Sequence, residues 1–136
     1  MYTIRKVFKL EGAHILSRSF SKECQRIHGH SYRVEIFIST EELNADGMVV
    51  DFKLMKNNIG YMIDCWDHRC LVSSDSYKGI ELLGTFHDSF VVVPFNPTAE
   101  NMCKDIYDRV KECVPNGFTL KVRIHETDTG YAEYYE

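Results

Sequence analysis

The stretch that decides the fold is "HGHSYRVEIFIS", residues 28–39, in which polar and apolar side chains alternate. This alternation predicts a β-strand, because successive side chains on a strand point to opposite faces of the sheet. The more apolar face carries His28, His30, Tyr32, Val34, Ile36 and Ile38. The other face carries Ser31, Arg33, Glu35 and Ser39, with Phe37 as the exception. We therefore predict a strand that brings two histidines to the face that meets the core.

A second alternating stretch lies upstream, in residues 2–15, and its more apolar face ends with His14. If the two strands pair through the intervening loop, His14 joins His28 and His30 on one face, and Gly29 leaves room between the last two. Three histidines with an open fourth position are typical of a catalytic zinc site. The alternative for any one of them is a core histidine satisfied by a backbone carbonyl.

Two helices are predicted farther along the chain. Residues 51–64 follow helical spacing with Asp51 as N-cap, and residues 96–114 do so with Thr98 as N-cap. A hairpin is expected after the second helix, with a strand on either side of "TDTG", residues 127–130.

The order of these elements is strand, strand, helix, helix, strand, strand. A short extra strand is expected in "FVVVPF", residues 90–95, while residues 65–89 are expected to be irregular. This order predicts an α+β fold in which an antiparallel four-stranded sheet carries two helices on one face. One domain accounts for residues 1–136. The second face of the sheet would remain open, so we expect the chain to form a homo-oligomer around a symmetry axis.

Composition excludes several classes of function. The net charge is −4 and no long basic run is present, which argues against nucleic acid as a partner. No apolar run approaches the roughly 20 residues that span a bilayer, so no membrane partner is expected. The N-terminal "MYTIRKVFKL" lacks the features of a signal peptide, and we expect a cytoplasmic protein. Five cysteines, an odd number, do not suggest a disulfide framework.

Three further groups could carry chemistry near the histidines. Cys24 lies in the linker between the first two strands, where it could close the metal site as a fourth ligand or move protons as a thiolate. Asp67 and His68 are adjacent, and the carboxylate could fix the tautomer of the imidazole, although an Asp-His dipeptide also occurs by chance. The flanking pair Cys65 and Cys70 has a spacing that is a poor zinc signature.

Glu126 ends a predicted strand in phase with three apolar residues, Leu120, Val122 and Ile124. A carboxylate in phase with core residues is costly unless it has partners. A nitrogen-rich heterocycle with adjacent N–H and amino groups would supply two parallel donors to it. The alternative is a strand end that is simply exposed to solvent.

Together these residues resemble the 6-pyruvoyltetrahydropterin synthase family, and the resemblance covers nearly the whole chain. The motifs that carry it occur in family order: "EGAHIL" at 11–16, "CQRIHGH" at 24–30, "GMVVDF" at 47–52, "WDHRCL" at 66–71, "NPTAEN" at 96–101 and "HETDTGYAEY" at 125–134. The resemblance implies a T-fold assembled as trimers that stack into a hexamer, with active sites between subunits.

The resemblance also implies roles for individual residues. The implied zinc ligands are His14, His28 and His30, and the implied proton-abstracting base is Cys24. Asp67 and His68 would be a proton-transfer pair that comes from a neighbouring subunit. Glu126 would anchor the pterin ring, and Thr98 and Glu100 would line its pocket.

The family's substrate is 7,8-dihydroneopterin triphosphate. Zinc would polarise its side-chain hydroxyls, Cys24 would take and return protons, His68 would serve the other step, and triphosphate would leave by elimination. One family outcome is 6-pyruvoyltetrahydropterin, and the other is 6-carboxytetrahydropterin with acetaldehyde, for queuosine and other deazapurines. The compact chain and the C-x3-H-G-H spacing look more like the short bacterial 6-carboxytetrahydropterin synthases. A different class of function is a non-catalytic pterin- or metal-binding protein, which would need neither Cys24 nor His68.

The chain departs from the usual family pattern in its last motif. Asp128 and the pair Gly130–Tyr131 stand where Pro and Ser-Trp are more usual, and Val72 stands where Asn is frequent. None of these departures removes a proposed ligand or catalytic group.

Overall fold

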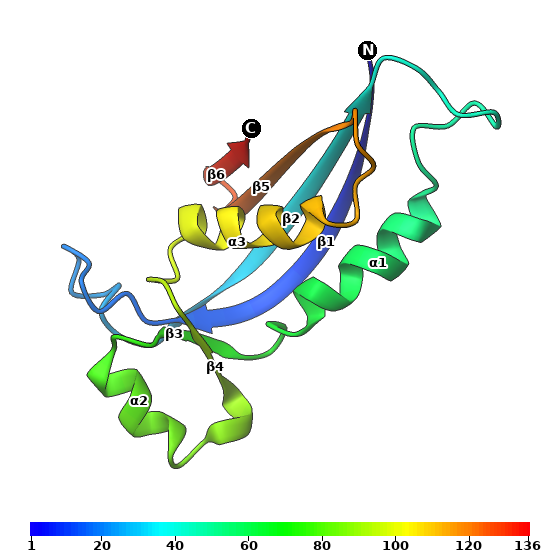
Figure 1. Cartoon of the computed structure of the whole chain (residues 1–136). Coiled ribbons are helices and arrows are strands. Elements are labelled where there is room, and N and C mark those ends of the chain that lie inside the picture. Colours follow the sequence, from blue (N-terminus) through cyan, green and yellow to red (C-terminus); the bar gives the residue numbers. More distant parts are fainter.

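The two alternating stretches form the two long strands of the molecule (Figure 1). This computed structural model describes residues 1–76 and 80–136 with their side chains, and residues 77–79 only as part of a helix. Strand β1 (Tyr2–His14) pairs antiparallel with β2 (His28–Thr40). The ladder runs from Tyr2 opposite Thr40 to His14 opposite His28. The predicted pairing is therefore confirmed, and it places two histidines directly across from each other.

Four more strands complete the sheet, in the order β4-β3-β1-β2-β5-β6. Strands β5 (Thr119–Thr127) and β6 (Gly130–Tyr135) form the predicted hairpin and continue the antiparallel pairing from β2. Strands β3 (Cys70–Ser73) and β4 (Phe90–Val93) extend the sheet on the other side in parallel orientation.

The prediction of an antiparallel four-stranded sheet is therefore wrong, because the sheet is mixed and has six strands. Strand β4 lies in the predicted short strand, but β3 falls within residues 65–89, which were expected to be irregular. All four residues of β3 are buried, so the strand shows no alternation that a sequence pattern could reveal. The same stretch also contains helix α2 (Tyr77–Leu83) and a 3₁₀ turn (His87–Ser89).

Both predicted helices are present, and both begin at the predicted N-caps. Helix α1 (Phe52–Asp64) follows Asp51, whose Oδ1 accepts a hydrogen bond from the Lys53 N–H at 2.6 Å. Helix α3 (Ala99–Lys111) follows Thr98, whose hydroxyl accepts from a backbone N–H at 3.3 Å. The two helices lie on the same face of the sheet, where α3 packs on β5 and β6 and α1 packs on β1 (Figure 1).

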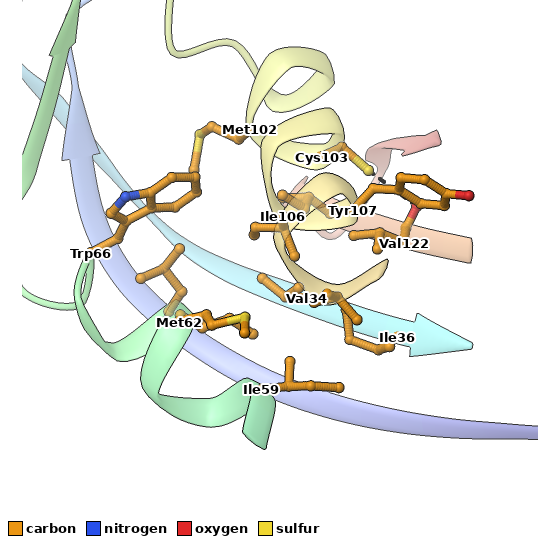
Figure 2. Packing of buried hydrophobic residues seen from close by; sticks show 14 of the residues in the cluster. Val34, Ile36, Ile59, Met62, Trp66, Met102, Cys103, Ile106, Tyr107 and Val122 are labelled. Atoms are coloured by element: carbon orange, nitrogen blue, oxygen red, sulfur yellow. Dashed lines mark hydrogen bonds between the residues drawn. The ribbon is translucent and has the colours of Figure 1, made fainter. Parts of the chain in front are cut away.

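The core lies between these helices and the sheet. Figure 2 shows apolar side chains of both layers facing one another, among them Ile59, Met62, Trp66, Met102, Ile106, Val34 and Ile36. Each such side chain contributes about 1.5–3 kcal/mol when it is removed from water. Arg109 joins the two helices, because its Nη1 donates to the Met62 carbonyl at 2.8 Å while its guanidinium lies 4.5 Å from the centre of the Trp66 ring.

The opposite face of the sheet carries charged side chains around one buried carboxylate. The Glu35 side chain is 4% exposed, and its oxygens lie 3.3 Å from Arg33 Nε, 3.5 Å from His125 Nε2 and 3.8 Å from Arg123 Nη1. The sheet is thus apolar on the helix side and polar on the other, as the alternation in β2 predicts. Among the described residues, no helix is long and apolar enough to cross a membrane.

Candidate metal centre

Three histidines meet at the end of the sheet where β1 ends and β2 begins, beside the segment that leads into α3 (Figure 1). His14 and His28 are cross-strand partners, and His30 follows on the same face of β2. One ligand atom from each of the three lies within 4.8 Å of the others. The structure therefore brings together the three predicted metal ligands.

Two backbone carbonyls fix the tautomers of two of these rings. His14 Nδ1 lies 2.7 Å from the Pro97 carbonyl oxygen, and His28 Nδ1 lies 2.8 Å from the Arg26 carbonyl oxygen. A carbonyl oxygen can only accept, so each Nδ1 carries a proton and donates it. The Nε2 atoms of His14 and His28 then face each other at 2.8 Å with their lone pairs. That arrangement is unfavourable for two neutral rings unless a cation takes the lone pairs, so these residues fit a bound metal ion.

Burial keeps His14 and His30 in the form that binds a metal. Burial lowers the pKa of His14 to about 4. The Pro97 hydrogen bond acts in the opposite direction, and the neighbouring His28 and His30 lower the pKa further. Burial also lowers the pKa of His30, against the opposing effect of the Glu126 charge. His30 Nε2 is buried and has no hydrogen-bond partner among the described residues. Neutral imidazoles with free lone pairs are what metal ligation requires at neutral pH.

Glu126 lies beside the histidines rather than apart from them. It occupies an irregularity in the pairing of β5 with β6, between His125 and Thr127. Its Oε1 lies 3.6 Å from His30 Nε2 and its Oε2 lies 4.0 Å from His14 Nε2. The side chain is 31% exposed, so the carboxylate is neither fully buried nor a simple surface group.

A cavity of about 280 Å³ adjoins this carboxylate. The three residues predicted to contact a pterin all line it: Glu126, Thr98 and Glu100. The remaining walls come from Leu16, Thr127 and residues 130–132 of β6. The histidine cluster and the cavity with the predicted ring-binding residues therefore lie next to each other, with Glu126 between them.

Asp67 and His68 form the predicted pair, with His68 Nδ1 2.7 Å from Asp67 Oδ2. The backbone of Glu11 holds both residues, because its N–H donates to Asp67 Oδ1 at 2.9 Å and its carbonyl accepts from the His68 N–H at 2.6 Å. Although partial burial acts in the opposite direction, the Glu11 N–H and the His68 side chain lower the pKa of Asp67.

The His68 side chain points into solvent and not onto the other histidines. Its backbone is left-handed (φ 57°), and its side chain is 77% exposed. It lines a cavity of about 540 Å³ that also reaches Glu11, Ser31 and His30. Among the described residues, no hydrogen bond, ion pair or ring contact joins His68 to the three histidines. Among the described residues, His68 and His30 therefore share a cavity but make no direct contact.

Cys24 lies in the loop between β1 and β2, half-buried, with its carbonyl accepting from the Leu16 N–H at 2.9 Å. Its thiol does not belong to the group of ligand atoms that the three histidines form. Cys65 and Cys70 do not belong to that group either, and burial raises the pKa of the Cys70 thiol to about 11.

Sequence reasoning missed two contributors to the site. The Pro97 carbonyl orients His14, and a backbone group leaves no signal in a side-chain pattern. Tyr32 lies under the cluster, with its ring centre 5.3 Å from that of His30 and 5.9 Å from that of His14. Its hydroxyl is buried without a hydrogen-bond partner among the described residues. The sequence signal that could have identified Tyr32 as part of the site is its position on the same strand face as His28 and His30.

Comparison with known proteins places this site in a family. A family model described as 6-pyruvoyl tetrahydropterin synthase matches residues 3–136. A 6-carboxy-5,6,7,8-tetrahydropterin synthase from Helicobacter pylori is 33% identical, over 97% of this chain and 72% of its own length. A protein of the same name from Haemophilus influenzae is 30% identical, over 100% of both chains. The names of both relatives agree with the prediction of an enzyme.

Solved structures show the same fold. An uncharacterized protein from Wolinella succinogenes has a TM-score of 0.82 at 23% identity, covering 99% of this chain and 98% of its own. The 6-pyruvoyl tetrahydropterin synthase of Plasmodium vivax has a TM-score of 0.76 at 15% identity, covering 100% and 99%. Because the family model and full-length relatives both span nearly all of its sequence, the chain belongs to the 6-pyruvoyl tetrahydropterin synthase family.

Proposed function

We propose that this protein is a zinc-dependent lyase that converts 7,8-dihydroneopterin triphosphate and one water molecule to 6-carboxy-5,6,7,8-tetrahydropterin, acetaldehyde and triphosphate. The observation that carries the proposal is the convergence of three histidine nitrogens within 4.8 Å, next to a cavity lined by Glu126, Thr98 and Glu100. A metal centre and a ring-binding cavity that adjoin at Glu126 suit a substrate whose ring is held while its side chain reacts.

The donor set supports zinc. Three neutral imidazoles are a common set for catalytic zinc, and the fourth position is then left for substrate or water. Carbonyl partners on Nδ1, as at His14 and His28, are the usual second layer of such sites. When bound, the zinc ion would polarise the side-chain hydroxyls of the substrate and acidify the neighbouring C–H bonds.

The remaining steps belong to side chains of the protein. Glu126 would accept the paired N–H and amino groups of the pterin ring and so orient the substrate. Cys24 would take a proton from the activated carbon and return it. Asp67 accepts the Nδ1 proton of His68, which leaves His68 Nε2 free to exchange a proton with the substrate in the other step.

The position of His68 supports an active site shared between subunits. His68 is presented to solvent by a left-handed backbone and has no contact with the metal ligands of its own chain among the described residues. In a homo-oligomer, the pair Asp67–His68 of one subunit would serve the metal centre of its neighbour. We propose the trimer, stacked into a hexamer, as that assembly.

The curated relatives favour the 6-carboxy product over the 6-pyruvoyl product. Relatives from Helicobacter pylori and Haemophilus influenzae, which match 97% and 100% of this chain, bear the 6-carboxy name, whereas the Plasmodium vivax protein, at 15% identity, supports the fold alone.

The test is product identification by mass spectrometry after the zinc-loaded protein is incubated with 7,8-dihydroneopterin triphosphate. We expect the 6-carboxy pterin, acetaldehyde and triphosphate in equal amounts. The 6-pyruvoyl product would overturn the choice of reaction, and no turnover by fully metallated protein would leave a non-catalytic binding protein. Protein stripped of metal by a chelator is the matched control and should be inactive until zinc is restored.

A further inference from the structure

The Glu126 carboxylate has an unusual set of neighbours. Its two oxygens face two different metal ligands, 3.6 Å from His30 Nε2 and 4.0 Å from His14 Nε2. Beyond these two histidines, it makes no hydrogen bond or ion pair with any residue that the structure describes. A half-buried carboxylate with no donor of its own is costly, so its position calls for a positive partner.

The distances match those between ligands of one metal ion. With zinc–nitrogen bonds of about 2.0–2.1 Å, neighbouring ligand atoms of a tetrahedral site lie roughly 3.3–3.4 Å apart. Two different Glu126 oxygens face His30 and His14, and they exceed that spacing by roughly 0.2–0.7 Å. The carboxylate lies outside the tight group that the three histidines form, so ligation requires the Glu126 side chain to move toward His28.

The local backbone accounts for this placement. Glu126 lies in the register irregularity between His125 and Thr127, where the pairing of β5 with β6 is interrupted. Such an irregularity re-aims a side chain relative to a regular strand and is frequent beside active sites. The same carboxylate also lines the cavity with Thr98 and Glu100, so one side chain borders both the metal ligands and the ring-binding space.

We propose that Glu126 is the fourth ligand of the metal ion while no pterin is bound, and that it leaves the metal when a pterin ring takes both of its oxygens. This inference rests on the proposed function, because it assumes that the cavity receives a pterin. Two parallel donors on the ring would take one lone pair from each carboxylate oxygen and turn the carboxylate toward the ring, so ring binding competes with metal ligation. The fourth position of the metal then opens only when a ring is in place, which couples substrate recognition to the metal centre.

The experiment compares metal binding in the absence of pterin. Co²⁺ is the probe, since its visible absorption reports how many ligands surround it. We expect Glu126→Gln to weaken Co²⁺ binding by about tenfold or more and to change the visible spectrum, in line with the loss of a metal-site partner. Glu100→Gln is the matched control, because Glu100 lines the same cavity but does not contact the histidines, and it should keep the wild-type affinity and spectrum. A Glu126→Gln variant that binds Co²⁺ with wild-type affinity and an unchanged spectrum would overturn the inference.

A second measurement needs no variant and covers the case in which Glu126→Gln does not fold. Pterin without a side chain is titrated into Co²⁺-loaded wild-type protein, so that no hydroxyl can replace the carboxylate. We expect the spectrum to change at saturation and the Co²⁺ affinity to fall, because two events that compete with each other weaken each other reciprocally. A spectrum that stays constant while the pterin binds would contradict the exchange.

The two proposals fail in different ways. If wild-type protein turns over the triphosphate but Glu126→Gln binds Co²⁺ like wild type, only the ligand exchange fails. If the Co²⁺ measurements come out as expected and the zinc protein does not turn over the triphosphate, the lyase proposal fails and the exchange stands.

Discussion

His14 donates a hydrogen bond from Nδ1 to the carbonyl oxygen of Pro97 at 2.7 Å, across 83 positions of sequence. The bond joins the last residue of β1 to the segment that leads into α3. Because Thr98 and Glu100 follow directly, the same contact that orients His14 also anchors the segment that lines the cavity beside Glu126. The candidate metal centre and this cavity are therefore positioned by the same segment.

The metal centre should depend on all three histidines. His28→Ala removes one of three converging ligands, so we expect the variant to lose stoichiometric zinc, as measured by elemental analysis after gel filtration. His87→Ala is the control, since His87 is exposed and lies outside the cluster. Full zinc occupancy in His28→Ala would contradict the three-histidine site.

Metal binding and turnover should separate at Cys24. The thiol is not part of the converging ligand group, so Cys24→Ala should bind zinc like wild type and lose turnover by about 10²-fold or more, as expected for loss of a general base. Activity and zinc content are measured on the same sample. Cys113→Ala, which removes an exposed thiol away from the cluster, should change neither. Loss of zinc in Cys24→Ala would instead identify Cys24 as a ligand.

A shared active site predicts complementation between inactive subunits. Cys24→Ala and His68→Ala should each be inactive, yet mixed oligomers should regain up to about one quarter of the wild-type activity, because random pairing on a symmetric ring puts an intact Cys24 beside an intact His68 at that frequency. The two variants are unfolded together, refolded as a mixture and assayed. Activity that remains absent in verified mixed oligomers would place both residues in sites within single subunits.

The metal-free protein should lose stability in mild acid through His14. Its pKa falls from 6.5 to about 4 in the folded state, chiefly through burial. Below pH 6.5 the unfolded chain therefore takes up a proton that the folded chain does not, and stability falls as the pH drops toward 4. A shift of this size corresponds to about 3 kcal/mol in the free energy of unfolding. Urea unfolding at several pH values measures it, and His14→Gln should show a smaller loss over the same interval. Equal losses in both proteins would assign the acid sensitivity to other groups.

The core beneath the site should be sensitive to cavities. Ile106 is fully buried between α3 and the sheet, so Ile106→Ala should cost about 2–5 kcal/mol in the free energy of unfolding. Leu54→Ala is the control, because Leu54 is an exposed residue of α1 and its truncation should cost less than about 1 kcal/mol. Chemical denaturation of both variants compares them directly, and similar costs would argue against the packing in Figure 2.

Most of the long elements could be predicted because their patterns are local. The alternation predicted over residues 2–15 and 28–39 appears as strands Tyr2–His14 and His28–Thr40. The N-caps Asp51 and Thr98 lie where the sequence predicts them. Strand β3 could not be predicted, since four consecutive buried residues carry no period. The parallel pairing of β3 with the end of β1 depends on contacts between residues far apart in the chain, such as Ala13 with Cys70.

By itself, the sequence determined which side chains share a face, because the period of a strand is fixed by its backbone. That was sufficient to bring His14, His28 and His30 together once β1 and β2 paired. Only the tertiary structure decided what surrounds them. The Pro97 carbonyl reaches His14 because α3 packs where it does, Glu126 reaches two Nε2 atoms because the β5 pairing is interrupted, and His68 turns outward because its backbone is left-handed. These relationships depend on packing between distant segments, and a periodic pattern along the chain contains no record of such packing.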